Sequence, residues 1–446
     1  MNRRATLRAQ ATGGRIRCGT ARSLVLPLAV AMVFWFGAAS AASRETPPPS
    51  DVTSSPLARE VETPAHEALR LTQLAGLNGN GKLEHRLGLD LREEYLRFDT
   101  IENGRFTLTT SEGLKLNFTL LPWLQQRLEN FFHDNRNRFS FGAIVVLEPA
   151  TGKVLAMVEQ NRSREPQRHH LALQASYPAA SLFKIITLAA ALEANDSLDA
   201  DSRFYYRGSQ FNISRRELEQ NPRYLPKHIS LSRAFAKSNN PVFGAIAFRY
   251  VGPFLLKQYA QAFGFNQKLR FDYPVERSNL VIADDPLTLA RIGAGLWRET
   301  TISPLHAALL AATIGNDGIM MAPYIVSSIH DANDTLLYRA RPDAVGHPIS
   351  GVTSGDIREM MFESVLDGTL RAAFSRNGKP LLPVQVGGKT GTLRGNDPRG
   401  KYSWFVGLAP LRKPKIAIAA MVVDPLSWRV KAHQVGREVV EAFFER

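Results

Sequence analysis

The sequence predicts an α+β domain in which helices pack on the faces of one antiparallel sheet. Strand-like segments stand at both ends of the stretch from Leu120 to Phe444, and the part between them, roughly residues 180–375, is mostly helical in pattern. This order predicts that the last strands lie beside the first two, with the helical segment as an insertion between them. A small N-terminal module over residues 67–118 precedes the domain, which we place at residues 119–446.

Each predicted element rests on a local pattern of residues. Pro122 suits the first turn of a helix, and Pro149–Gly152 suits a turn between two β-branched, apolar strands. Alternating polar and apolar residues predict a hairpin in the small module that turns at Ser111–Gly113. The predicted strands are Arg105–Thr109, Leu114–Phe118, Phe141–Glu148, Lys153–Val158, Val384–Leu393, Tyr402–Leu408 and Ile416–Val423, and a helix at Val430–Phe444 closes the chain.

The N-terminus carries the pattern of an export signal. Six arginines and no acid precede the apolar segment Leu24–Ala42, which ends in the small residues Ala39-Ser40-Ala41. Its 19 residues also suffice for an uncleaved membrane anchor, so residues 1–42 are expected to be a signal peptide or an anchor in the cytoplasmic membrane. Under both interpretations the remainder is extracytoplasmic, because positive flanks stay in the cytoplasm. Residues 43–66, rich in Pro, Ser and Thr, are expected to form a linker.

Composition excludes several classes of function. The chain has 446 residues and a formal charge of +14, of which the leader supplies six charges. We find no nucleic-acid motif, so we expect the net positive charge to lie on a solvated surface that faces anionic lipid or the cell wall. The only cysteine, Cys18, lies in the leader, which excludes a disulfide or a cysteine-based metal site in the exported part. We expect no cofactor and no metal.

The first motif with catalytic potential is Ser181-Leu182-Phe183-Lys184 at the start of an apolar helix. A spacing of three places the two polar side chains on one helical face. A serine hydroxyl needs a base to act as a nucleophile, and a lysine desolvated by apolar neighbours can hold a lowered pKa and serve as that base. A capping serine beside an exposed lysine is the structural alternative.

The second and third motifs would complete such a site. Ser238-Asn239-Asn240 lies between two helical segments, where Ser238 can relay a proton and the Asn240 amide can bind a substrate carbonyl. The same pattern recurs at Ser375, and a helix cap is the alternative for both copies. The third motif, Gly387–Thr392, lies on a predicted strand and offers a cation and two hydroxyls for a substrate carboxylate. A phosphate-binding loop is excluded, because no glycine stands five positions before Gly388, where that loop needs one.

The three motifs in this order resemble those of penicillin-binding proteins and serine β-lactamases. The segments GAIVVLEPATGKVLAMV, TISPLHAALLAATIGNDGIMMAP and YSWFVGLAP extend the resemblance to the transpeptidase domain of penicillin-binding proteins over Leu120–Phe444. The resemblance implies that Ser181 is the acylated nucleophile, with Lys184 as its proton partner. The other implied site residues are Ser238, Asn240, Lys389, Thr390, Gly391 and Thr392, with the backbone N–H groups of Ser181 and Thr392 as the oxyanion hole.

The resemblance also implies substrates and partners. The expected ligands are peptidoglycan stem peptides that end in D-Ala-D-Ala and β-lactam antibiotics, and cell-wall synthesis proteins are possible partners. The 75 or so residues between leader and domain are too few for a glycosyltransferase module, so a monofunctional D,D-transpeptidase is expected. Pro178-Ala179-Ala180 departs from the Pro-Gly that relatives usually carry before the nucleophile, which predicts an altered turn.

Two other functions remain open from sequence. The same chemistry with water as acceptor would make the protein a D,D-carboxypeptidase or a β-lactamase. A non-catalytic β-lactam sensor or wall-synthesis scaffold is the alternative of another class. Glu217 and Asn221 have the spacing that places a deacylating water in class A β-lactamases, but they precede Ser238, so we assign them to a helix surface. His169-His170 is expected to be an exposed loop, Asp284-Asp285 a turn and helix cap, and Trp404 a packed strand aromatic.

Overall fold

A five-stranded antiparallel sheet with the strand order β16-β17-β18-β4-β5 forms the centre of the molecule. The computed structural model describes residues 98, 100–111, 113–162, 170–377, 379–424 and 429–445. The strands are β4 (Phe141–Leu147), β5 (Val154–Asn161), β16 (Gly387–Asn396), β17 (Arg399–Ala409) and β18 (Ile416–Asp424). The prediction that the last three strands lie beside the first two is confirmed.

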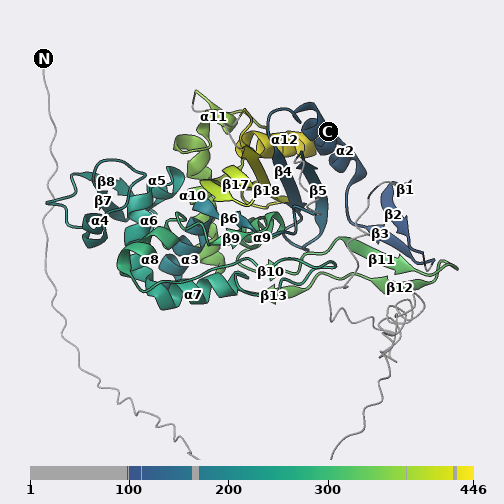
Figure 1. Cartoon of the computed structure of the whole chain (residues 1–446), viewed down its shortest axis with the longest axis horizontal. Coiled ribbons are helices and arrows are strands. Elements are labelled where there is room, and N and C mark those ends of the chain that lie inside the picture. Colours follow the sequence, from purple (N-terminus) through teal and green to yellow (C-terminus); the bar gives the residue numbers. More distant parts are fainter. Residues whose placement is uncertain are drawn as a thin grey trace, which may run out of the picture. The chain divides into compact units, whose positions relative to one another are not determined.

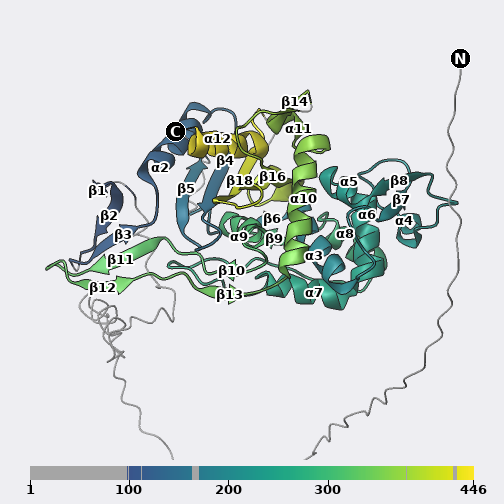
Figure 2. The same cartoon turned by 180° about the vertical axis from the view of Figure 1, so that it is seen from behind.

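Helices cover both faces of this sheet, which explains why the inner strand β4 is apolar along its whole length (Figures 1 and 2). In β4, Ala143 and Val145 belong to the core that includes α9 (Pro304–Gly315). Ile144 and Val146 belong to the opposite core, with α2 (Pro122–Asp134) and α12 (Ala432–Phe444). Successive side chains point to opposite faces of a strand, so one apolar strand supplies two cores.

The segment between the two sets of strands is mostly helical, as predicted, and polar side chains start several of its helices. Ser230, Asn239 and Ser303 each accept a hydrogen bond from a backbone N–H of the helix that follows. Asp285 does the same for Thr288, which confirms its predicted capping role. The remaining helices are η2 (Ala180–Phe183), α3 (Lys184–Ala194), α4 (Arg215–Glu219), α5 (Leu231–Ala236), α6 (Asn240–Ile246), the π-helical η3 (Ala247–Val251), α7 (Gly252–Ala262), α8 (Pro286–Gly293), α10 (Gly351–Asp367) and α11 (Arg371–Phe374).

Short strand pairs interrupt the helical segment and were not predicted. They are β6 (Tyr177–Pro178) with β9 (Thr301–Ile302), β7 (Arg203–Tyr206) with β8 (Lys227–Ser230), β10 (Met320–Met321) with β13 (Ala344–Gly346), and β14 (Ser375–Arg376) with β15 (Lys379–Pro380). Strands of two to four residues are too short to show an alternating pattern in the sequence.

A second five-stranded sheet, with the order β1-β2-β3-β11-β12, begins the described chain. Its strands are β1 (Thr100–Glu102), β2 (Arg105–Thr109), β3 (Lys115–Phe118), β11 (Val326–His330) and β12 (Leu336–Arg339). Strands β2 and β3 form the predicted hairpin. Strand β3 also pairs with β11, which comes from a distant part of the chain. Phe98 packs on Phe106 and Phe118 with ring centroids 6.0 and 5.3 Å away.

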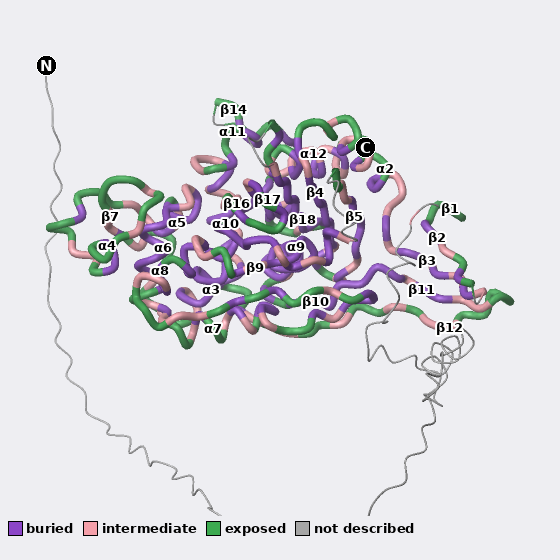
Figure 3. Tube along the Cα trace, in the orientation of Figure 1, coloured by how far each residue is buried: buried purple, intermediate pink, exposed green. Residues whose placement is uncertain are grey.

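Buried residues run through both sheets and the helical segment, whereas the exposed residues gather on the outer helices and turns (Figure 3). Among the residues that the structure describes, no helix combines the length and the apolar character needed to cross a bilayer. The predicted leader, linker and first part of the small module, residues 1–97, lie outside the described residues.

Candidate active site

The fold brings the three motifs together. Ser181 lies in the 3-10 turn η2, and Lys184 begins the α-helix that follows, so the catalytic helix opens with a tighter turn than expected. Ser238 lies in the loop between α5 and α6, and Asn240 is the first residue of α6. Lys389 lies on β16, an edge strand of the central sheet.

Lys184 is completely buried and has three oxygen partners. Its Nζ lies 3.0 Å from Ser181 Oγ, 2.8 Å from Asn240 Oδ1 and 2.6 Å from the carbonyl oxygen of Ala294. None of these groups is a carboxylate. Burial, and then the nearby charge of Lys389, hold the pKa of Lys184 well below its usual value.

The chemistry of these partners determines how a neutral Lys184 would be oriented. The amide oxygen of Asn240 and the carbonyl of Ala294 can only accept, so they take the two N–H donors of a neutral amine. The lone pair is then left for the remaining partner, Ser181, whose hydroxyl can donate. The geometry therefore aims the base at the serine proton.

Lys389 forms a second lysine–serine pair. Its Nζ donates to Ser238 Oγ at 2.9 Å and to the carbonyl of Thr390 at 3.0 Å. The side chain is buried, and burial lowers its pKa to about 7. Phe235 lies under the amine at 5.5 Å from its ring centroid.

Two non-glycine residues next to the reacting groups have left-handed backbones. Ala180, which precedes Ser181, has φ 51°, and Ser238 has φ 54°. Such conformations are costly for residues with a Cβ and are concentrated at functional sites. The altered turn expected from Pro178-Ala179-Ala180 is thus an alanine in a conformation that favours glycine.

Close packing explains the glycine of the third motif. A Cβ placed on Gly391 would lie 3.1 Å from Trp404 Cβ and 3.3 Å from Ala180 Cβ. Glycine therefore lets β16 approach the turn that carries the nucleophile. This approach places Thr392, which is exposed, one residue beyond the contact. The oxyanion hole of Ser181 and Thr392 stays a prediction.

Several groups that complete the cluster were not predicted. The carbonyl of Ala294 accepts from Lys184, and the carbonyl of Phe211 accepts from Asn240 Nδ2 at 2.9 Å. Every residue type carries a backbone carbonyl, so no sequence signal distinguishes these two. Thr369 Oγ1 lies 2.8 Å from the hydroxyl of Thr390, and Thr369 belongs to no motif.

The structure corrects one sequence interpretation and confirms another. Glu217 is buried rather than on a helix surface, because its carboxylate accepts from the backbone N–H and the hydroxyl of Ser214 as a capping box. Trp404 is a packed aromatic, as predicted, and its indole N–H donates to the carbonyl of Pro178 at 2.9 Å. His169 lies outside the described residues, and the described part of the chain holds no cluster of three metal-ligating side chains.

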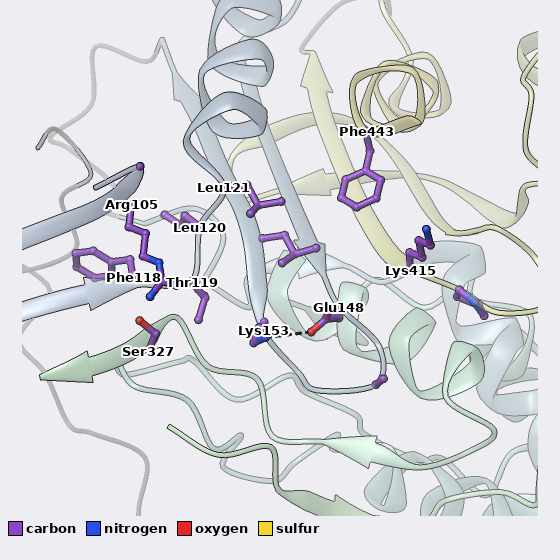
Figure 4. Close-up of a pocket in the computed structure, with 14 residues that line it drawn as sticks. Arg105, Phe118, Thr119, Leu120, Leu121, Glu148, Lys153, Ser327, Lys415 and Phe443 are labelled. Carbon is purple, nitrogen blue, oxygen red and sulfur yellow. Dashed lines mark ion pairs between the residues drawn. The ribbon is translucent and has the colours of Figure 1, made fainter. Parts of the chain in front are cut away.

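A separate cavity of about 680 Å³ lies away from the three motifs (Figure 4). Its lining combines the β2–β3 hairpin, the β4–β5 and β17–β18 turns and the C-terminal helix. Arg105, Lys153 and Lys415 supply positive charge there, and Glu148 pairs with Lys153 at 3.5 Å. It contains no nucleophile next to a base, so we place the candidate active site at the motif cluster.

Comparisons with known proteins agree with this site. Residues 142–445 match the family model of the penicillin binding protein transpeptidase domain. The chain is 30% identical to the peptidoglycan D,D-transpeptidase PbpA of Mycobacterium tuberculosis over 379 residues, which cover 76% of this chain and 74% of the relative. It is 29% identical to PbpA of Mycolicibacterium smegmatis over 353 residues, 72% of this chain and 69% of that one.

Solved structures give the same result. The crystal structure of PBPA from Mycobacterium tuberculosis superposes with a TM-score of 0.60 at 26% identity and covers 73% of this chain and 81% of its own. The D,D-transpeptidase domain of a peptidoglycan glycosyltransferase from Eggerthella lenta gives 0.61 at 27% identity, with 74% and 82% covered. With its three motifs joined in one cluster, this chain belongs to the penicillin-binding protein transpeptidase family.

Proposed function

We propose that the protein is a D,D-transpeptidase that cross-links peptidoglycan through an ester on Ser181. The observation that carries the proposal is the set of partners of Lys184: two obligate acceptors and one serine hydroxyl. This arrangement prepares a neutral amine to remove the proton from Ser181. The named peptidoglycan D,D-transpeptidases among the relatives support the choice of substrate.

In acylation, Ser181 Oγ attacks the carbonyl carbon between the two terminal D-alanines while Lys184 takes the hydroxyl proton. The C–O bond forms, and the C–N bond to the terminal D-alanine then breaks. The leaving amine needs a proton, and Ser238 can supply it because its hydroxyl lies 2.9 Å from Lys389 Nζ. Lys184 thus keeps the proton of the nucleophile, and Lys389 replaces the proton that Ser238 gives to the leaving amine.

Substrate recognition is assigned to β16 and to Asn240. As an edge strand, β16 offers unpaired backbone groups to an extended peptide, which would bind as an additional strand. Lys389 is buried, so the hydroxyls of Thr390 and Thr392 would contact the terminal carboxylate while Lys389 contributes charge. Asn240 Nδ2 gives one N–H to Phe211 and keeps the other for a substrate carbonyl.

The acyl group is expected to pass to an amine rather than to water. Rapid hydrolysis of a serine ester needs a base that positions a water. Glu217, which has the spacing for that role, is committed to its capping box with Ser214. An acceptor amine from a neighbouring stem peptide would be bound next to the ester, and this proximity raises its rate of attack above that of free water. The amine attacks the ester carbon and gives a proton to Ser238 and Lys389, the C–O bond breaks, and Ser181 regains its proton from Lys184.

The location and the partners of the enzyme follow from its substrate. Peptidoglycan lies outside the cytoplasm, which agrees with the export pattern of residues 1–42. We propose an enzyme at the outer face of the cytoplasmic membrane that works with other cell-wall synthesis proteins.

Labelled penicillin tests the nucleophile. Mass spectrometry should place one covalent penicilloyl group on Ser181, as expected for a family in which the Mycobacterium tuberculosis relative has been solved as a penicillin G acyl-enzyme complex. Ser181→Ala should abolish the label, with Ser176→Ala as the matched control. A label on another residue, or an undiminished label on Ser181→Ala, would refute the assignment.

The fate of the acyl group needs its own assays. Nitrocefin should give one equivalent of product and then negligible turnover, and peptidoglycan precursors with a suitable acceptor should give cross-linked dimers. Sustained nitrocefin turnover would identify a β-lactamase. Release of D-alanine without dimers would identify a carboxypeptidase, and absence of all three reactions would favour a sensor or scaffold.

A further inference from the structure

A basic lobe adjoins the second motif. We define the basic lobe as residues 203–228, which comprise β7, α4 and the start of β8. These elements lie at one end of the described part of the chain, where exposed residues gather (Figures 1 and 3). Its exposed cations are Arg203, Arg207, Arg215, Arg216, Arg223 and Lys227. The basic lobe has two carboxylates. Glu219 is exposed, whereas Glu217 is buried in its capping box.

Most of these cations lack a counter-charge. Asp285, which caps α8, lies close enough to Arg215 for the two charges to interact. Within the described part of the chain, Arg207, Arg216 and Arg223 form no ion pair with a carboxylate. Clustered like charges raise the local potential and attract a polyanion.

The scaffold under these charges is well ordered by hydrogen bonds. Gln220 exchanges two bonds of 2.8 Å with the backbone of Tyr205, which fixes the end of α4 on β7. Lys227 Nζ donates to the carbonyl of Gly208 at 2.7 Å. The backbone that carries these cations is therefore held in place before a ligand binds, which lowers the entropy lost on binding.

The basic lobe is joined directly to the catalytic cluster. The backbone N–H of Asn240 donates to the carbonyl of Gln210, and its side chain donates to the carbonyl of Phe211, both at 2.9 Å. The Phe211 ring is 64% exposed, although neighbouring Ile213 packs on α6 at Gly244. The backbone of an exposed aromatic residue is therefore anchored to Asn240, at the point where the basic lobe meets the motif cluster.

We propose that the basic lobe binds the peptidoglycan strand whose stem peptide enters the cleft, with Phe211 as an apolar platform for a sugar ring. An uncross-linked strand carries a carboxylate at the end of every stem peptide, so it is a polyanion of the required sign. The inference rests on the proposed function, because that function brings the strand to Asn240. An anionic phospholipid surface would match the charge but not the bonds between the basic lobe and the cleft.

Charge reversal tests the inference. The triple variant Arg207→Glu, Arg216→Glu, Arg223→Glu should bind isolated pentapeptide-containing peptidoglycan about tenfold more weakly at low salt, as measured by cosedimentation. The difference should shrink at high salt, because exposed charges are screened. Arg412→Glu, Lys413→Glu, Lys415→Glu, at exposed positions of the β17–β18 turn, makes the same change of charge and should bind like the wild type.

Penicillin acylation separates binding from folding, since a small ligand does not need the basic lobe. All variants should be acylated at the wild-type rate, and if the glutamate variant fails to fold, the corresponding glutamine variant should show a smaller loss of binding. Wild-type binding by the basic-lobe variant, or an equal loss in the control variant, would overturn the inference. So would lobe-dependent binding to anionic phospholipid vesicles but not to peptidoglycan. A wild type that binds peptidoglycan but is not labelled by penicillin would count against the proposed function alone.

Discussion

The two lysine–serine pairs of the cleft differ in how firmly their proton positions are set. Lys184 has two obligate acceptors besides Ser181, whereas Lys389 has one, the carbonyl of Thr390, besides Ser238. In the first pair, these contacts direct the lone pair of a neutral Lys184 toward the hydroxyl of Ser181. The second keeps a spare N–H, and with a pKa lowered to about 7 it changes charge near neutral pH. The difference teaches that one pair is arranged as a base and the other as an adjustable charge and proton donor.

Removing the first lysine should have the largest effect. Lys184→Met should slow acylation by labelled penicillin by roughly 10²–10⁴-fold, because a positioned base is lost. Thermal unfolding should show a folded protein, and Lys257→Met, at an exposed position of α7, should react at the wild-type rate. Near-normal acylation of a folded Lys184→Met would place the base elsewhere and would remove the distinction between the two pairs.

Removing the second lysine should act selectively. Lys389→Met should weaken acylation by β-lactams that carry a carboxylate by roughly 10- to 100-fold, the equivalent of a charge-assisted interaction of about 1.5–3 kcal/mol. Analogues without the carboxylate should lose much less. Comparison of second-order acylation rates for the two ligands measures this, and equal losses would mean that Lys389 supports only the structure or the proton path.

The pH dependence should follow the second lysine. Because the pKa of Lys389 lies at about 7, its positive charge is present below that pH and is lost above it. The preference for a carboxylate-bearing β-lactam over its analogue should therefore fall up to tenfold between about pH 6 and about pH 8. Taking the ratio of the two acylation rates cancels the titration of Lys184. A ratio that is flat in the wild type, or that still falls in Lys389→Met, would contradict this assignment.

The turn before the nucleophile should give the smallest effect. Ala180→Gly relieves a left-handed alanine, worth about 1–2 kcal/mol, but removes a buried methyl worth about 0.8 kcal/mol. We expect the free energy of unfolding to rise by up to about 1 kcal/mol, as measured by denaturant titration. Ala179→Gly is the matched control, since Ala179 is buried with a helical φ of −63° and should lose stability. A loss in both variants would show that packing outweighs strain.

The sequence was sufficient for the central sheet and for the members of the site. Long apolar strands and the order of the motifs are local features, so β4, β5, β16, β17 and β18 and the cluster of Ser181, Lys184 and Lys389 could be predicted from them. The sequence could not predict the short strand pairs or the pairing of β3 with β11, because they depend on contacts between distant segments.

What each lysine does was decided only by the tertiary structure. The sequence predicted that Lys184 and Lys389 belong to the site, but the lowering of their pKa values follows from complete burial without a carboxylate partner. The carbonyl of Ala294, 110 positions from Lys184 along the chain, fixes the direction of its lone pair. Glu217 shows the reverse case, in which a residue with catalytic spacing is committed to a helix cap. Desolvation and hydrogen-bond direction depend on what surrounds a side chain in space, which its neighbours in sequence do not specify.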